Sequence, residues 1–118
     1  MYQEVTKGLE MDASGEVWEV SQAVEMGKDD AVGVQVWVIN GNLSSSNTLT
    51  VYLEVSSDLE NWLPHVDQKT IQEAPSITYI PAYSYPSDVR FRFVRLKYNV
   101  AAAAKVLFGA SIQTLTWA

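Results

Sequence analysis

Alternation of apolar and polar residues with a period of two is the sequence feature that most constrains the fold of this chain. Every even position in residues 32–38 is valine, and every odd position in residues 49–55 is a branched aliphatic residue. Successive side chains of a β-strand point to opposite faces of its sheet, so the pattern predicts two strands that each bury one face. The polar segment 40–47 between them is shorter than a parallel crossover requires, which favours an antiparallel hairpin.

The same alternation predicts further strands along the rest of the chain. They lie in five segments, residues 16–26, 62–66, 77–80, 89–98 and 105–117. In the first of these, Trp18 and Val20 are expected on the buried face with the apolar residues that follow at even positions. In the fourth, the apolar positions change parity, which predicts a β-bulge near Phe93. Short strands separated by turns, with no amphipathic helix, predict an all-β fold, a single antiparallel β-sandwich of about seven to eight strands.

The chain has the length of one domain, with 118 residues and no linker or internal repeat. Residues 1–14 are polar and lack regular alternation, so they are expected to form an N-terminal arm that lies against a neighbouring subunit. Residues 15–118 are expected to form the β-sandwich domain.

Composition removes several kinds of chemistry. The chain has no cysteine and a single histidine, His65, which excludes thiol catalysis, cysteine metal sites and sites with several histidines. No nucleophile is placed beside His65 by the sequence, which favours a structural role. Acidic pairs that could hydrolyse glycosides or hold calcium, such as Asp58 with Glu60, lie in turn signals. Since no glycine-rich phosphate loop occurs either, the sequence predicts a protein that is not an enzyme and that holds no cofactor or metal.

The net charge of −6 is unevenly distributed along the chain. Residues 1–30 hold eight acids against two lysines, whereas residues 88–118 hold five basic residues against one acid. A net acidic protein repels phosphate, which disfavours general nucleic-acid binding. The charged segments are either solvated strand faces or acidic and basic surfaces that meet between subunits. The candidate interface consists of Tyr2, Glu4, Glu10, Asp12, Arg90, Arg92, Arg95 and Lys97.

Aromatic residues supply a second candidate surface. Trp37 and Tyr52 alternate with the apolar positions of their strands, so they are expected on the faces opposite the core. Further tyrosines gather beside a proline-containing loop. Such rings could stack on sugars, form the centre of a protein interface, or be buried within the subunit. The candidate aromatic surface consists of Trp37, Tyr52, Tyr83 and Tyr85.

Two parts of the sequence carry a family resemblance. Residues 48–62 contain a strand, a Ser-x-Asp turn and a tryptophan, and residues 92–96 read Arg-Phe-Val-Arg-Leu before the final strand. These features resemble discoidin-like, or galactose-binding-like, jelly-roll domains, and similar patterns occur on the compact jelly rolls of small bacteriophage virion accessory proteins. The resemblance implies a jelly-roll type of sandwich in which Asp58 closes the turn and Trp62 covers the hairpin end as a lid. Leu59 stands where the family usually has glycine.

Together these observations predict a noncatalytic structural protein that acts through protein–protein contacts. The most specific expectation is a bacteriophage virion accessory protein, such as a capsid decoration or head-surface protein, that forms homo-oligomers or binds other virion proteins. The alternative is a carbohydrate-binding module that uses the exposed aromatic residues. No export signal and no apolar stretch of membrane-helix length is visible. The protein is therefore expected to be made in the cytoplasm and assembled into a virion.

Overall fold

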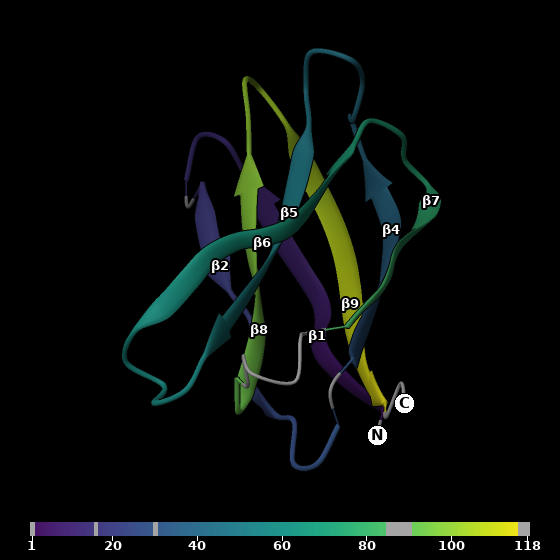
Figure 1. Ribbon diagram of the computed structural model, residues 1–118. Coiled ribbons are helices and arrows are strands. Elements are labelled where there is room, and N and C mark those ends of the chain that lie inside the picture. The colour runs from purple at the N-terminus through teal and green to yellow at the C-terminus, as the bar shows by residue number, and fades with distance from the viewer. Residues whose placement is uncertain (1, 16, 30, 85–90, 116–118) are drawn as a thin grey trace.

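The computed structural model describes residues 2–15, 17–29, 31–84 and 91–115, without the side chains of residues 64–66 and 81–84. Within these residues the chain forms two antiparallel sheets that pack face to face (Figure 1), and no helix is long and apolar enough to cross a membrane. The described strands are β1 (Tyr2–Asp12), β2 (Trp18–Val20), β3 (Val24–Glu25), β4 (Ala31–Gly41), β5 (Leu49–Ser56), β6 (Trp62–Ile71), β7 (Ser76–Ser84), β8 (Phe93–Val100) and β9 (Lys105–Leu115). The four-stranded sheet has the order β1-β9-β4-β7, and the five-stranded sheet has the order β2-β8-β5-β6, with β3 also paired to β8.

The core lies between the sheets and is built from the alternating positions of the sequence. The even-numbered valines of β4 and the odd-numbered aliphatic residues of β5 are all at most 4% exposed. Tyr98 and Phe108 meet edge to face in this core, with ring centroids 4.8 Å apart. The Tyr98 hydroxyl lies 2.5 Å from Oγ1 of Thr6 and so has a partner, while burial raises the pKa of Tyr98. The predicted all-β antiparallel sandwich is confirmed.

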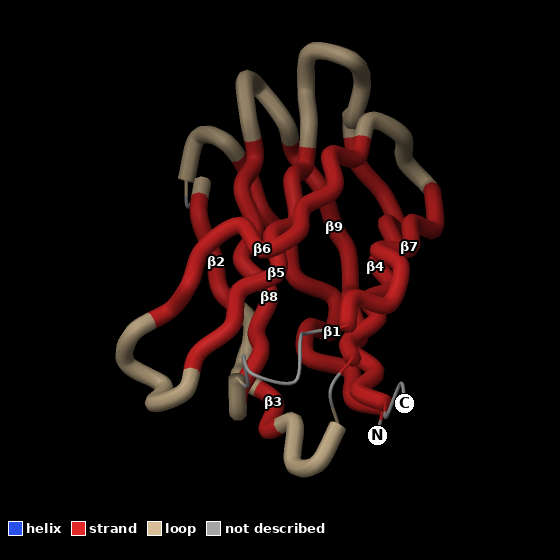
Figure 2. The backbone as a smooth tube through the Cα atoms, in the orientation of Figure 1, coloured by secondary structure: helices blue, strands red, loops and turns tan. Residues whose placement is uncertain are grey.

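The predicted hairpin between β4 and β5 is wrong. β4 pairs with β7 and β9 in one sheet, whereas β5 pairs with β6 and β8 in the other. The polar segment between them therefore bridges the two sheets as an arch (Figure 2). Asn42 and Asn47 hold this arch by hydrogen bonds to the backbone of residues 103–105. Alternation reports which face of a strand is buried, but the neighbouring strand is chosen by contacts distant in sequence.

The segment predicted as one strand over residues 16–26 is divided into β2 and β3. Val20 lies opposite Lys97, and Val24 lies opposite Val94. The chain therefore advances four residues from β2 to β3 while β8 advances only three. One extra residue reverses the faces of the positions beyond it. Trp18 is consequently 43% exposed although Val24 is buried, and the prediction that they share the buried face is wrong.

The β-bulge predicted near Phe93 does not lie within β8 itself, although the Arg92 amide just before the strand donates a hydrogen bond of 3.1 Å to the carbonyl of Ser56, which pairs with Phe93. β8 pairs with β5 in unbroken register from Phe93, opposite Ser56, to Val100, opposite Leu49. Phe91 lies before the strand and packs against the core from there. The change of parity in the sequence therefore marks the beginning of β8, where the chain enters the ladder.

The N-terminal segment differs from the expected arm, because residues 2–12 form β1 at the edge of the four-stranded sheet. β1 pairs with β9 of the same chain, with two shifts of register that break the alternation in the sequence. Gly8 lies in the second shift with a φ of 58°, a conformation that glycine adopts at little cost. Val5 and Met11 still reach the core. Their burial orders a segment that has no regular pattern in the sequence.

Candidate binding surfaces

The outer face of the five-stranded sheet carries aromatic and cationic side chains in contact with one another. Trp18 stacks on Tyr52 with ring centroids 5.9 Å apart, and Nζ of Lys97 lies 4.7 Å from the centroid of the Trp18 ring. The Arg95 guanidinium lies 4.1 Å from the centroid of the Trp62 ring. Trp18 and Val20 remain 43% and 47% exposed. We name this surface the aromatic–cation face, and it consists of Trp18, Val20, Tyr52, Trp62, Arg95 and Lys97.

Strand register places these side chains side by side. Val20 of β2 lies opposite Lys97 of β8, which in turn lies opposite Tyr52 of β5. Arg95 of β8 lies opposite Glu54 of β5. Since the alternate residues of β5 and β8 point into the core, the outward residues form a continuous strip across the sheet.

Glu54 holds Arg95 in position. Nε of Arg95 donates a hydrogen bond of 2.9 Å to Oε1 of Glu54. The Glu54 side chain is 3% exposed, and that of Arg95 is 22% exposed. A carboxylate this deeply buried requires a paired cation, because an unpaired charge removed from water is very unfavourable. The ion pair thereby fixes the guanidinium over Trp62 at one end of the aromatic–cation face.

The turn from β5 to β6 is organised by Asp58. Its Oδ1 accepts hydrogen bonds from the Ser56 hydroxyl and from two backbone amides of the turn, one of them that of Asn61. The side-chain amide of Asn61 donates to Oδ2. These hydrogen bonds, those from Asn61 foremost, hold the pKa of Asp58 well below its usual range. The Trp62 indole donates a hydrogen bond of 3.2 Å to the Leu59 carbonyl, so this ring lies against the turn.

Leu59 has a φ of 66° in this turn, which explains why glycine suits the position. For a residue with a Cβ atom, this left-handed conformation is about 1–2 kcal/mol less favourable than the right-handed one. Glycine avoids that penalty but loses about 0.4–1 kcal/mol through its more flexible unfolded state. We expect Leu59→Gly to raise the free energy of unfolding by about 0.5–1 kcal/mol, measured by urea denaturation. Leu59→Ala is the control, and a gain of the same size in that variant would contradict the explanation.

The predicted interface residues are distributed over both layers. The acidic edge lies on β1, in the four-stranded sheet, whereas the basic residues lie on or just before β8, in the five-stranded sheet. Arg92 lies 3.6 Å from Glu25, and Lys105 lies 3.8 Å from Glu10, so part of the charge is balanced within one chain. Arg90 lies outside the described residues. The acidic edge comprises Tyr2, Glu4, Glu10 and Asp12, and the described basic residues are Arg92, Arg95 and Lys97.

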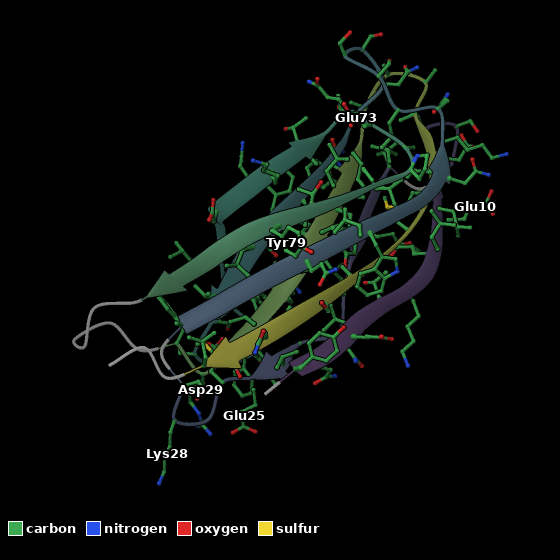
Figure 3. The ribbon with its side chains drawn as sticks, turned by 90° about the vertical axis from the view of Figure 1, so that its right-hand side faces the viewer. Glu10, Glu25, Lys28, Asp29, Glu73 and Tyr79 are labelled. Carbon is green, nitrogen blue, oxygen red and sulfur yellow. The ribbon has the colours of Figure 1, made fainter. Side chains whose placement is uncertain are left out.

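The four-stranded sheet also carries aromatic residues on its outer face, among them Tyr79 (Figure 3). The Trp37 indole lies against Gly109, where an added Cβ would be 2.5 Å from the ring. Tyr79 on β7 is 62% exposed and borders a trough of about 270 Å³ that Ser111 also lines. Trp37 and Tyr52, grouped by the sequence in one candidate surface, therefore lie on different layers. The side chain of Tyr83 and all of Tyr85 lie outside the described residues.

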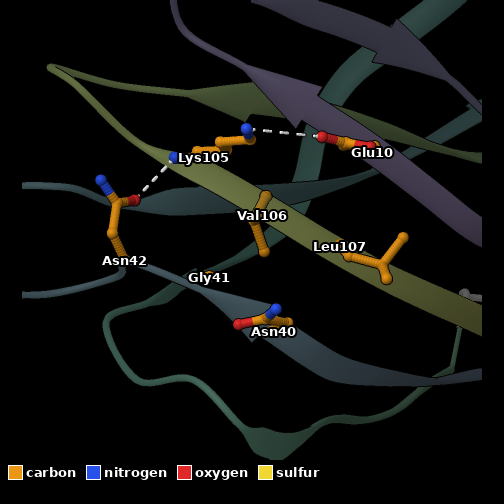
Figure 4. A pocket seen from close by; sticks show the side chains of 7 residues that line it. All are labelled: Glu10, Asn40, Gly41, Asn42, Lys105, Val106 and Leu107. Atoms are coloured by element: carbon orange, nitrogen blue, oxygen red, sulfur yellow. Dashed lines mark hydrogen bonds and ion pairs between the residues drawn. The ribbon is translucent and has the colours of Figure 1, made fainter.

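A separate hollow of about 430 Å³ lies where β1, β4 and β9 meet the arch (Figure 4). Oδ1 of Asn42 accepts a hydrogen bond of 2.7 Å from the Lys105 amide, and Nζ of Lys105 lies 3.8 Å from Glu10. Gly41 approaches β9 so closely that a Cβ there would lie 2.7 Å from the Lys105 carbonyl oxygen. The polar groups of this hollow thus fasten the arch to β9, which gives it a structural role.

The described residues contain no gathering of three or more His, Cys, Asp or Glu side chains that could hold a metal ion. The side chain of His65 lies outside this part of the chain. Asp58, from the candidate acidic pair, is engaged by the hydrogen bonds of its own turn. The described residues do arrange two outer sheet faces that expose aromatic side chains, Trp18 on one and Tyr79 on the other.

Several residues of these faces were not among the residues predicted from the sequence, and Trp18, Val20 and Ser111 are the most important of them. Trp18 has the parity of Val24 and Met26, and the only signal against burial is the polar pair at residues 21–22 that interrupts the strand. Ser111 gives no signal, because serine is ordinary at an outward position of a strand. Its special environment arises from side chains on the neighbouring strands β1 and β4 and on β7 beyond them.

No protein-family model matches the sequence, and no curated protein matches it. Among solved structures, the chain is similar to the PBSX exported protein XepA, with a TM-score of 0.70 and 11% identity over 100% of this chain and 38% of that chain. It is similar to PirA, with a TM-score of 0.57 and 11% identity over 95% of this chain and 94% of that chain. It is also similar to a structure of infectious bursal disease virus, Gx strain, with a TM-score of 0.58 and 5% identity over 98% of this chain and 31% of that chain. At these identities the likeness shows a shared fold alone.

Proposed function

We propose that this domain is a noncatalytic virion accessory domain of a bacteriophage, of the capsid decoration or head-surface kind, that assembles with further copies of itself. The observation that carries the proposal is the aromatic–cation face. Trp18 and Val20 are exposed there, with Lys97 over the Trp18 ring and Arg95 over the Trp62 ring. Side chains that are already positioned lose little conformational entropy on binding, so their burial by a partner is favourable.

The composition of this face suits a protein interface. Tryptophan, tyrosine and arginine are enriched among the residues that dominate binding energy at protein interfaces. Arg95 is neutralised by Glu54, which leaves Lys97 as the cation offered to a partner on this strip. A complementary acidic partner surface would therefore strengthen the contact and fix its orientation.

A second copy of the chain carries such an acidic surface. Glu4 and Glu10 have side chains 43% and 64% exposed on β1, at the edge of the four-stranded sheet. β1 and β8 belong to different layers, so the acidic edge of one copy and the aromatic–cation face of another would meet head to tail. Such contacts generate rings when the rotation closes. A similar fold occurs in the PBSX exported protein XepA and in a structure of infectious bursal disease virus, so the fold is compatible with a role in a viral particle.

Gel filtration with light scattering tests this assembly. The wild-type chain, 13.1 kDa as a monomer, is expected to show the mass of an oligomer that dissociates on dilution. Replacing Trp18 with alanine together with Val20 with serine should raise the dissociation constant at least about thirtyfold, since buried interface tryptophans contribute this much. Lys97→Glu should weaken assembly in a way that depends on salt concentration.

Tyr79→Ala is the matched control, because it removes an exposed aromatic ring from the opposite layer. This variant should retain the mass of the wild type. A wild-type chain that is monomeric at every concentration would overturn the proposal. An unchanged mass for the variant altered at Trp18 and Val20 would overturn the assignment of the face.

A further inference from the structure

The trough on the outer face of the four-stranded sheet lies on the opposite layer from the aromatic–cation face. Figure 3 labels Tyr79, which lines it. It measures about 270 Å³ and lies between Tyr2 on β1 and Tyr79 on β7. Ser111 of β9 lies opposite Gln35 of β4, which lies opposite Tyr79, so register brings these three side chains into one row. We name it the tyrosine trough, and the lining residues used below are Tyr2, Gly33, Gln35, Tyr79, Ser111 and Gln113.

Ser111 supplies the trough with a polar group that has no partner within the described residues. The residue is only 2% exposed, and its hydroxyl takes part in no hydrogen bond among the parts of the chain that the structure describes. A buried hydroxyl that is left unpaired destabilises the fold, and native proteins rarely keep one without a reason. A ligand that brings its own hydroxyl into the trough would satisfy Ser111.

The walls and floor of the trough suit a flat ligand. Tyr2 and Tyr79 are 57% and 62% exposed, so ring surface is open on either side. The floor is free at Gly33, where an added Cβ would meet no atom within 4 Å. The side-chain amides of Gln35 and Gln113 add both hydrogen-bond donors and acceptors. The trough thus combines aromatic surface with groups that pair with hydroxyls.

The charge of the site selects a neutral ligand. Every described residue that lines the trough is uncharged. Glu4 of β1 lies opposite Ser111 in register, and Nζ of Lys7 lies 3.9 Å from its carboxylate, so these two charges offset each other. Because no described lining residue is a cation, phosphates, uronates and nucleic acids would gain no ion pair in the trough. A pyranose ring without charge offers an apolar face for stacking and several hydroxyls for pairing.

We infer that the tyrosine trough is a binding subsite for a neutral oligosaccharide. One sugar ring lies between Tyr2 and Tyr79, with a hydroxyl on Ser111 and others on the side-chain amides. The volume of about 270 Å³ lies just below the range of about 300–1,000 Å³ typical of whole-ligand sites, so the trough holds one unit of a longer chain. The inference does not rest on the proposed assembly, although the trough borders the β1 edge that carries Glu4, on the opposite layer from the aromatic–cation face.

Calorimetric titration of the full chain with neutral oligosaccharides tests the inference. The probes are cellohexaose, xylohexaose and mannohexaose, with hexagalacturonate as the anionic comparison. At least one neutral probe should bind, and the anionic probe should not. Tyr79→Ala should weaken that binding about tenfold, and Ser111→Ala should weaken it severalfold through the lost hydroxyl.

Gly33→Val is the sharpest variant, because it adds a branched side chain to the floor of the trough at a position where the Cβ meets no atom within 4 Å. It should keep the melting temperature of the wild type and abolish sugar binding, while shifts of the Gly33 backbone amide on titration should locate the sugar in the wild type by NMR. Trp18→Ala, on the opposite layer, should bind the sugar as the wild type does. Failure of all three neutral probes at millimolar concentration, or undiminished binding by a folded Gly33→Val variant, would overturn the inference and leave the assembly proposal untouched.

Discussion

Replacing Glu54 with alanine should lower the free energy of unfolding by about 3 kcal/mol. The substitution leaves the Arg95 guanidinium without its carboxylate partner, at a site where the Glu54 side chain is 3% exposed. Removal of one member of a buried ion pair costs about 3–5 kcal/mol, because the remaining charge stays desolvated. The effect should fall at the lower end of this range, since Arg95 keeps 22% of its side chain exposed and water reaches it there.

Urea denaturation measures this change without adding salt that screens the ion pair. Glu73→Ala is the control, because an exposed glutamate on a loop should change stability by less than about 0.5 kcal/mol. The double variant Glu54→Leu with Arg95→Met should recover most of the loss, since a paired apolar replacement leaves no buried charge. A loss of unfolding free energy below about 1 kcal/mol in Glu54→Ala would show that Glu54 does not hold Arg95 in a buried ion pair.

Replacing Gly109 with alanine should destabilise the fold by about 2 kcal/mol. The new Cβ would lie 2.5 Å from the Trp37 indole, closer than non-bonded atoms approach. β9 is hydrogen-bonded on both sides, to β1 and β4, so the backbone cannot move away from the ring. The indole must therefore leave its position on the sheet, and one added methyl group displaces a large aromatic contact.

Gly33→Ala is the matched control for Gly109→Ala, because it makes the same change on the same face at a position with no atom within 4 Å. It should leave stability unchanged or slightly raised, since alanine reduces the freedom of the unfolded chain. Near-ultraviolet circular dichroism should report the displacement of Trp37 only in Gly109→Ala. Equal stability of the two variants would contradict the packing of Trp37 on Gly109.

Those parts of the fold that rest on local alternation could be predicted from the sequence. The valines of β4 and the aliphatic residues of β5 identify both strands and their buried faces. The same alternation places Tyr52 on the outer side of the five-stranded sheet, where it meets Trp18. Local patterns succeed here because both strands keep a regular two-residue repeat that the pleat requires.

The remaining features depend on contacts between segments distant in the sequence. β4 and β5 are neighbours along the chain yet belong to different sheets, a choice made by pairing with β9 and β8. The exposure of Trp18 follows from one extra residue between β2 and β3, which a local pattern reveals only once the partner strand is known. Ser111 becomes buried because residues of neighbouring strands surround it. Such properties belong to the assembled sheet and have no counterpart in a single segment.

The most direct test of assembly through the aromatic–cation face uses the absence of cysteine from the chain. Val20→Cys introduces one thiol at an exposed position of that face, and Gln72→Cys introduces one at an exposed position elsewhere. Their rates of reaction with a maleimide are measured across protein concentrations. We predict that Cys at position 20 is protected at high concentration and becomes reactive on dilution, while Cys at position 72 reacts rapidly throughout. Equal and concentration-independent reactivity of the two thiols would contradict the account.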